Sequence, residues 1–302
     1  MSKARMVLPL VTYLVTRRTS QRFFRFPPGD EVVHQIFEYA LAYAASLTGV
    51  QVHAWILMSN HFHLVATDVE GKAPIFFQLL DQTIANLLKR HFPDLEGELW
   101  NTSQTSAVDL SNELQPCDVT VIEKLVYTMG NAKTSGLVSK WTQWEGSMTK
   151  PEDMGQRVLR VERPTCASLR TTLPAVVEMQ VHVPPSLAHW TRNELMEMLR
   201  GELRAIPRPT NPIGMKRIRE QGIWERPKTK AKRSTINPHV AGDTERRMAM
   251  IALLKAFRAE YQCALEKYCD GEECVFPEGT WKMRLLFGVK VVGCSDPPAQ
   301  AA

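Results

Sequence analysis

Two histidines separated by one residue are the side chains of this sequence best suited to chemistry. His61 and His63 flank Phe62 in a segment rich in strand-forming residues. Because side chains alternate between the faces of a strand, both imidazoles are expected on one face, about 6–7 Å apart along the strand. Two imidazoles at that spacing can hold one cation. An isolated His-x-His pair is a weak indication, and surface or packed histidines are the alternative.

A tyrosine farther along the chain lies in a segment that predicts a helix over about 119–130. Its apolar face consists of Ile122, Leu125, Val126 and Met129. Lys124, Tyr127 and Asn131 fall on the opposite face, within about 60° of one another at roughly 100° per residue. Gly130 weakens the helix, so Asn131 is expected near its end. If this face covers the histidines, a phenol, an amide and two imidazoles converge; a half-buried tyrosine with a satisfied hydroxyl is the alternative.

The chain has 302 residues, 44% of them hydrophobic and 23% charged, which is typical of a globular protein. Its net charge of +5 is unevenly distributed. Residues 1–25 carry six Lys or Arg and no acidic residue, and residues 204–233 carry ten against Glu220 and Glu225. Such segments favour binding to phosphate polyanions. A solvated linker or tail is the alternative for each of them.

The six cysteines are scattered without a Cys-x-x-Cys pair and do not make a disulfide framework. Cys269 and Cys274, with Cys263 nearby, could hold a zinc ion, but ordinary reduced thiols are more usual. The apolar stretch 6–15 is interrupted by Pro9 and is expected to be a strand rather than a signal peptide. No apolar run approaches the roughly 20 residues that span a bilayer. We expect a cytoplasmic location and no membrane partner.

The first half of the chain predicts alternating strands and helices. Strands are expected over 7–18, 50–58 and 61–67, and helices over about 33–48 and from Pro74 onward. Residues 97–118 are expected to be irregular. This order is typical of an α+β fold with a ferredoxin-like antiparallel sheet.

The character of the sequence changes after about residue 150, where proline becomes frequent and periodic patterns weaken. We therefore expect a catalytic domain over 1–150 and a mainly helical or irregular C-terminal extension over 151–302. Within the extension, Thr191 heads a capping box before a helix to about Leu203, and a long helix is expected over 243–268. The basic, proline-containing segment 204–233 lies between these helices.

Two segments resemble the motifs of the single-tyrosine HUH transposases. His53–Val65 (HAWILMSNHFHLV) is similar to the form A-W-x-x-M-x-N-H-x-H-L of the REP-associated branch. Tyr127–Val138 (YTMGNAKTSGLV) resembles Y-x-x-x-N-P-V-x-A-G-L-V, and Trp144 and Ser147 match the tryptophan and serine that follow it. The resemblance covers about residues 7–148.

The chain departs from the second motif in the residues after Asn131. Ala132-Lys133 replaces Pro-Val, and Ser135 replaces an alanine. The two histidines, the tyrosine and the asparagine are all retained. The changes therefore bear on the end of the helix and on target choice rather than on the reaction.

The resemblance implies a metal-dependent single-stranded DNA endonuclease and strand transferase, a transposase that forms a 5′-phosphotyrosine. It implies Tyr127 as the nucleophile, His61, His63 and Asn131 as metal ligands, and Mg²⁺ or Mn²⁺ as the cofactor. The implied partner is single-stranded or hairpin-forming repeat DNA. A homodimer is also compatible with the family, and Tyr127 could act in its own subunit or across a swapped dimer.

Several basic residues are candidates for DNA contacts. Arg17, Arg18 and Arg22 are favoured because no acidic residue balances them nearby, and Lys89, Arg90 and Lys124 could each touch a phosphate. Trp224 could stack on an unpaired base or anchor a small core.

Two other functions fit parts of the pattern. A non-catalytic protein that binds single-stranded or hairpin DNA is supported by the altered residues after Asn131. A plasmid-type replication initiator or relaxase shares the His-x-His pair, but the chain length and the spacing from Tyr127 to Asn131 disfavour it.

Overall fold

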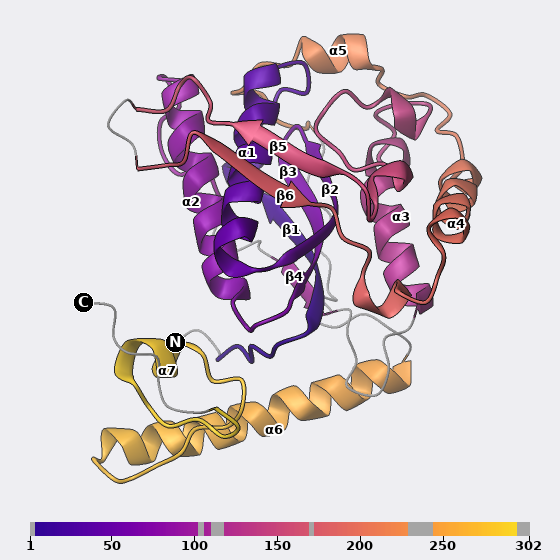
Figure 1. Cartoon of the computed structure of the whole chain (residues 1–302). Helices are drawn as coiled ribbons and strands as arrows, with labels where there is room; N and C mark the ends of the chain where they lie inside the picture. The colour runs from indigo at the N-terminus through magenta and orange to yellow at the C-terminus, as the bar shows by residue number, and fades with distance from the viewer. Residues whose placement is uncertain (1–3, 102–105, 110–117, 169–171, 229–243, 295–302) are drawn as a thin grey trace.

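The computed structural model describes residues 4–101, 106–109, 118–168, 172–228 and 244–294 (Figure 1). The first half contains β1 (Val11–Arg18), α1 (Glu31–Thr48), β2 (Gln51–Met58), β3 (His61–Asp68), α2 (Ala73–His91), β4 (Ser106–Asp109) and α3 (Asp118–Thr134). The second half contains β5 (Val158–Glu162), β6 (Val176–Gln180), α4 (Arg192–Ala205), α5 (Met215–Arg219), α6 (Thr244–Cys269) and α7 (Lys282–Phe287). Short 3-10 turns are Ser20–Arg22, Trp141–Gln143, Pro151–Asp153 and Pro185–Leu187.

The central sheet has four antiparallel strands in the order β2-β3-β1-β4. A mixed fold with small antiparallel sheets is therefore confirmed. The prediction that residues 97–118 are irregular is wrong at β4, which pairs with β1 at the edge of the sheet. Four residues are too few to show the alternation by which a strand is recognised in a sequence.

Helices cover both faces of this sheet (Figure 1). Phe62, Leu64 and other alternate residues of the strands pack in one core with α1 and α2. The residues between them face the other way, where Val65 packs with Leu125 and Met129 of α3. The alternation of β3 thus sends His61 and His63 toward the side that carries α3.

The ends of the main helices follow from their capping residues. The carboxylate of Asp30 accepts hydrogen bonds from the backbone N–H groups of Val32 and Val33 at the start of α1. Gly49 ends α1 with a left-handed backbone, at φ 72°. Pro74 lies in the first turn of α2, where it removes no intrahelical hydrogen bond.

The hydrophobic core does not stop at residue 150. The hairpin of β5 and β6 lies against α1, and Leu159 and Val177 belong to the core that α1 and α2 form with the sheet. Helix α4, predicted from the Thr191–Glu194 capping box, packs Leu199 and Leu203 against α3. The expected division near residue 150 therefore separates segments that share both cores.

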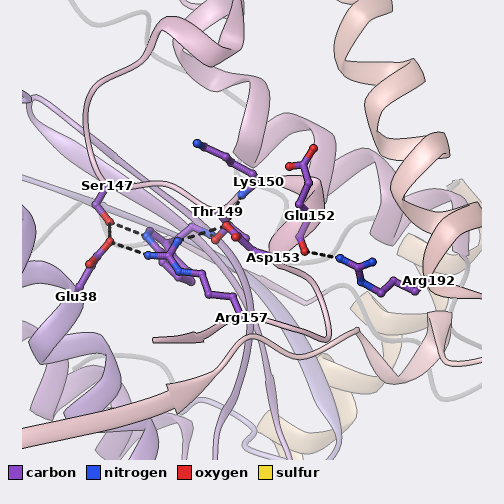
Figure 2. Close-up of polar contacts among 9 residues, drawn as sticks. Glu38, Ser147, Thr149, Lys150, Glu152, Asp153, Arg157 and Arg192 are labelled. Carbon is purple, nitrogen blue, oxygen red and sulfur yellow. Dashed lines mark hydrogen bonds and ion pairs between the residues drawn. The ribbon is translucent and has the colours of Figure 1, made fainter. Parts of the chain in front are cut away.

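A polar network attaches the segment after α3 to the rest of the fold (Figure 2). The hydroxyl of Ser147 accepts a hydrogen bond from Trp55 Nε1 at 2.8 Å and donates one to Glu38 Oε1 at 2.7 Å. Arg157 reaches Glu38 and Asp153, at 3.6 Å and 3.3 Å. The serine that follows the tyrosine motif thus joins β2 to α1.

The C-terminal part forms a separate small core. Helix α6 begins at Thr244 and ends at Cys269, close to the expected 243–268; Asp243 lies outside the described residues. Phe276, Met283 and Val291 pack with α6 and α7. The basic segment begins with the last two residues of α4, contains α5 and is otherwise irregular as far as residue 228; its residues 229–233 are outside the described ranges. No helix in the described ranges has the length and apolarity that crossing a membrane requires.

Candidate functional site

The two histidines lie together at the start of β3, next to the turn that joins it to β2. Both rings face α3, with their centroids 4.8 Å apart and their planes nearly perpendicular at 88°. His63 is 1% exposed, and His61 is partly exposed at the edge. The alternation predicted from the His-x-His spacing therefore does bring the two imidazoles side by side.

Each imidazole has its Nδ1 atom engaged by a neighbouring polar group. His61 Nδ1 is 2.7 Å from Oδ1 of Asn60, and His63 Nδ1 is 2.7 Å from the hydroxyl of Thr16. Since Nδ2 of Asn60 donates to the carbonyl of Arg22, its Oδ1 faces His61 and requires Nδ1–H there. The Nε2 lone pair of His61 is left for another partner.

Burial keeps both imidazoles neutral. Desolvation lowers the pKa of His63 to about 3, and the positive charge of Arg18 adds to the effect. Desolvation, followed by the charges of His63 and Arg18, lowers the pKa of His61 well below its usual value. Neutral imidazole is the form that binds metal ions, so both rings are ready as ligands at neutral pH.

Tyr127 projects from α3 toward this pair. Its hydroxyl is 3.5 Å from Nε2 of His63, and the two ring centroids are 5.0 Å apart in an edge-to-face arrangement. This is a long contact for a hydrogen bond. The tyrosine is 39% exposed, so part of its side chain is open to solvent. All three side chains belong to the same chain.

Helix α3 continues past the glycine expected to end it. It runs to Thr134, so Asn131 lies within the helix and is only 4% exposed. Gly130 has a packing role, since a Cβ there would clash with the Ile206 side chain at the end of α4. The amide oxygen of Asn131 accepts a hydrogen bond from Ser135 at 3.3 Å. Its role as a third ligand remains a prediction.

The replacement of a valine by Lys133 has a structural reason. Lys133 is 7% exposed, and its ammonium group donates to the carbonyls of Leu203 and Arg204, at 3.2 Å and 3.4 Å. Those carbonyls belong to the last turn of α4, where a positive charge is stabilising. The departure from the family motif thus attaches α3 to α4.

The arginines of β1 point in opposite directions. Arg18 stands opposite His61 in the antiparallel register. Burial lowers the pKa of Arg18; the charge of Tyr127 acts to raise it and that of Arg22 to lower it. Arg17 points to the other face, where its guanidinium pairs with Asp81 at 2.8 Å and lies 5.2 Å from the Trp100 ring. The site therefore includes Arg18 and not Arg17.

The remaining candidates for DNA contacts are spread over two helices. Lys124 lies on α3, one turn before Tyr127, and is partly exposed. Lys89 and Arg90 are exposed at the end of α2, which covers the face of the sheet opposite the histidines. Lys124 is thus near the site, and the structure does not bring Lys89 and Arg90 to it.

Sequence reasoning missed Thr16 and Asn60, which hold the two imidazoles. Asn60 precedes His61 directly, so its position was available as a signal. Thr16 becomes visible only through the pairing of β1 with β3, which places it opposite His63. The loop after β1 has an unusual backbone. In it Gln21 and Arg22 adopt left-handed backbones, at φ 52° and 64°, a sparsely populated conformation found at functional sites.

The residues present suit a divalent cation. Two neutral imidazoles side by side can bind a divalent cation, and imidazole suits Mn²⁺ better than Mg²⁺. In the described part of the chain, no group of three or more His, Cys, Asp or Glu side chains is placed to hold a metal ion. The zinc site envisaged for Cys263, Cys269 and Cys274 is accordingly not formed.

Comparisons with known proteins find similarity among solved structures. No protein-family model and no curated protein matches the chain. Among solved structures, the chain is similar to a REP-associated tyrosine transposase bound to a REP hairpin, with 13% identity over 51% of this chain and 84% of the other, and a TM-score of 0.40.

Two further structures are similar over smaller parts of the chain. One is a proposed transposase from Deinococcus radiodurans, with 22% identity over 37% of this chain and 87% of the other, and a TM-score of 0.29. The other is the tRNA(His) guanylyltransferase of Saccharomyces cerevisiae, with 12% identity over 45% of this chain and 64% of the other, and a TM-score of 0.33. At such low scores, function has to be argued from the chain's own residues.

Proposed function

We propose that this chain is a metal-dependent transposase that nicks and rejoins single-stranded DNA through a 5′-phosphotyrosine on Tyr127. The observation that carries the proposal is the contact of 3.5 Å between the Tyr127 hydroxyl and Nε2 of His63. The resemblance of residues 7–148 to the single-tyrosine HUH transposases supports it. Assignment to the ferredoxin-like class belongs to the same proposal and is supported by the strand order β2-β3-β1-β4.

Tyr127 acts as the nucleophile in this reaction. Its oxygen forms a bond to the phosphorus of a DNA phosphodiester, the bond from phosphorus to the 3′ oxygen breaks, and the phenol proton is given up while the departing oxygen takes one. Because one phosphoester replaces another, attack by a second 3′-OH reverses the step and joins strands without a nucleotide cofactor. A phenol has a pKa of about 10, so at neutral pH it needs help to lose its proton.

The neighbouring residues supply that help and position the phosphate. His61, His63 and Asn131 would hold Mg²⁺ or Mn²⁺, which when bound polarises the phosphate and stabilises developing negative charge. Thr16 and Asn60 fix the orientation of the two rings. Arg18 brings a positive charge to the edge of the site.

A covalent-adduct assay tests the proposal. The protein is incubated with single-stranded hairpin oligonucleotides and Mn²⁺ and then run on a denaturing gel. We expect a DNA–protein adduct that is lost in Tyr127→Phe. Tyr268→Phe is the matched control, because Tyr268 is also 39% exposed and lies on α6. An adduct that persists in Tyr127→Phe contradicts the assignment of the nucleophile.

The second candidate is a DNA-binding protein without catalysis. It predicts hairpin binding with no adduct under any metal or substrate. The altered residues after Asn131 are its main support, and the contact of Lys133 with α4 gives one of these changes a structural reason that is independent of catalysis. The enzyme is therefore the better supported of the two.

A further inference from the structure

The loop between β1 and α1 is attached to the turn that carries the histidines. The hydroxyl of Thr19 donates to the carbonyls of Phe23 and Asn60, at 2.7 Å and 3.0 Å. The backbone N–H of Phe26 donates to the carbonyl of Ser59 at 3.0 Å, and Nδ2 of Asn60 donates to the carbonyl of Arg22 at 3.1 Å. Asn60 also contacts the ring of His61, so a single residue connects this loop to the proposed metal ligand.

A distant part of the chain reaches the same loop. The carbonyl of Glu225 accepts a hydrogen bond from the backbone N–H of Phe24 at 2.9 Å. The turn from Gly222 to Glu225 is closed by a backbone hydrogen bond of 2.9 Å, and Arg226 contacts Gln21 at 3.5 Å. The basic segment predicted to bind phosphate thus contributes Trp224 and Arg226 to the loop that is bonded to the histidine turn.

Trp224 stacks on a buried cation where the two segments meet. The guanidinium carbon of Arg25 lies 3.7 Å from the centre of the indole, and Phe23 meets the same indole edge-on at 5.9 Å. Arg25 is 4% exposed, and its Nη1 atom has no hydrogen-bond partner within the described residues. The indole is nevertheless 47% exposed. One face is therefore covered by the cation, and a large part of the ring remains open.

This exposure argues against Trp224 as a simple core anchor. Trp55, which is such an anchor, is fully buried with its N–H bonded to Ser147. An exposed indole backed by a guanidinium suits a flat, polarisable partner, and the nearby Arg22 and Arg226 suit a phosphate chain. Unpaired nucleobases of a single strand have both properties.

We propose that Trp224, held by Arg25 and Phe23, is a stacking site for one unpaired base of the DNA strand that enters the Tyr127 site. The proposal rests on the proposed function for the identity of the strand and adds where a base is bound. Stacking is tolerant of base identity, since every base presents a flat face. The site therefore aligns the strand and leaves the choice of sequence to other contacts.

The test compares two single strands of equal length, one bearing thymine at every position and one abasic throughout. Binding is measured by fluorescence anisotropy, with EDTA present and in the Tyr127→Phe background, so that neither cleavage nor a metal contributes. We expect Trp224→Leu to weaken binding of the thymine strand about 5- to 150-fold and to leave the abasic strand unchanged. Trp224→Phe keeps a flat ring and should retain most of the affinity. Phe287→Ala, an exposed aromatic on α7, is the matched control.

The deciding quantity is the ratio of the two affinities, because partial unfolding lowers both together. A ratio in Trp224→Leu equal to that of the parent protein overturns the stacking site. The result is distinguishable from the fate of the proposed function. A protein that forms no adduct can still show a changed affinity ratio in Trp224→Leu, and a protein that forms the adduct can show an unchanged one.

Discussion

Two buried histidines on neighbouring strands of the sheet differ in what their ring nitrogens contact. His53 on β2 and His63 on β3 are almost completely buried, and desolvation lowers the pKa of each to about 3. Both ring nitrogens of His53 are engaged within the fold, by the carbonyl of His182 at 3.0 Å and the hydroxyl of Thr67 at 2.7 Å. His63 has one nitrogen engaged by Thr16, and the other faces the Tyr127 hydroxyl at 3.5 Å.

The difference shows that burial and a shifted pKa do not by themselves identify a functional histidine. His53 is satisfied and joins β2 to β3. His63 is oriented on one side and keeps a nitrogen for a ligand or substrate. A nitrogen that the fold leaves available, next to a group that can react, is what separates the two.

The largest effects on adduct formation and on stability are expected from removing the imidazole rings of His63 and His53, respectively. His63→Ala should lower adduct formation about a thousandfold or more, because it removes a proposed metal ligand. His53→Ala should leave adduct formation per folded molecule nearly unchanged and lower the free energy of unfolding by about 2–4 kcal/mol, since it leaves a cavity and buried polar groups. Gel assays and urea unfolding measure the two quantities. Similar losses of activity in both variants would remove the distinction.

The pH dependence of stability isolates His53. Its folded pKa of about 3 lies below the unfolded value of about 6.5, so the unfolded chain binds the extra proton between these values. The stabilisation is complete above pH 6.5 and is lost as the pH falls toward 3. We expect the free energy of unfolding of the parent to fall more steeply than that of His53→Gln over this window, by about 1.4 kcal/mol per pH unit. Equal slopes would show that the ring already takes up a proton in the folded state.

The hydroxyls that contact His63 and His53 allow a matched pair of substitutions. Thr16→Val removes the partner of His63 Nδ1 and should lower metal affinity or adduct formation about 10- to 100-fold. Thr67→Val removes the partner of His53 Nε2 and should lower only stability, by about 1–3 kcal/mol. Manganese titration of adduct formation, together with unfolding curves, distinguishes these outcomes. An activity loss confined to Thr67→Val would reverse the roles of the two histidines.

The smallest effect is expected from changes to the basic residues. Changing both Arg18 and Arg22 to Gln should weaken single-strand binding. The slope of the logarithm of the binding constant against the logarithm of the salt concentration should become shallower by about 0.7 for each phosphate that the protein no longer neutralises. The same change at Lys89 and Arg90, on the far side of the sheet, should alter neither. Anisotropy titrations at several salt concentrations provide the measurement. A larger change from the α2 pair would place the DNA on the other face.

The strand that carries the histidines was predictable because it depends on local pattern. Alternation sets the direction of His61 and His63, and the residues Gly49 and Pro74 mark helix ends by their own backbone properties. The same rule also separates Arg17 from Arg18, which neighbour each other along β1 and therefore point to opposite faces. Arg17 pairs with Asp81 on the face away from the histidines, and DNA contact stays a prediction for both arginines.

The rest depends on contacts between distant residues. Thr16 reaches His63 through strand pairing, and Trp224 reaches Phe23 and Arg25 across about two hundred residues. No pattern among neighbouring residues of the sequence predicts contacts of this kind. The role of Lys133 was hidden for the same reason, since its partners are carbonyls of α4.

The attachment of α3 to α4 has a consequence for how the chain can be divided. Shortening the protein at the apparent change of composition near residue 150 would remove Leu195, Leu199 and Leu203 from the core that they share with Leu125 and Met129 of α3. An exposed apolar surface of that kind favours aggregation of the fragment. We therefore expect the shortest fragment that keeps the packing of α3 to extend at least to Ile206, whose side chain lies against Gly130.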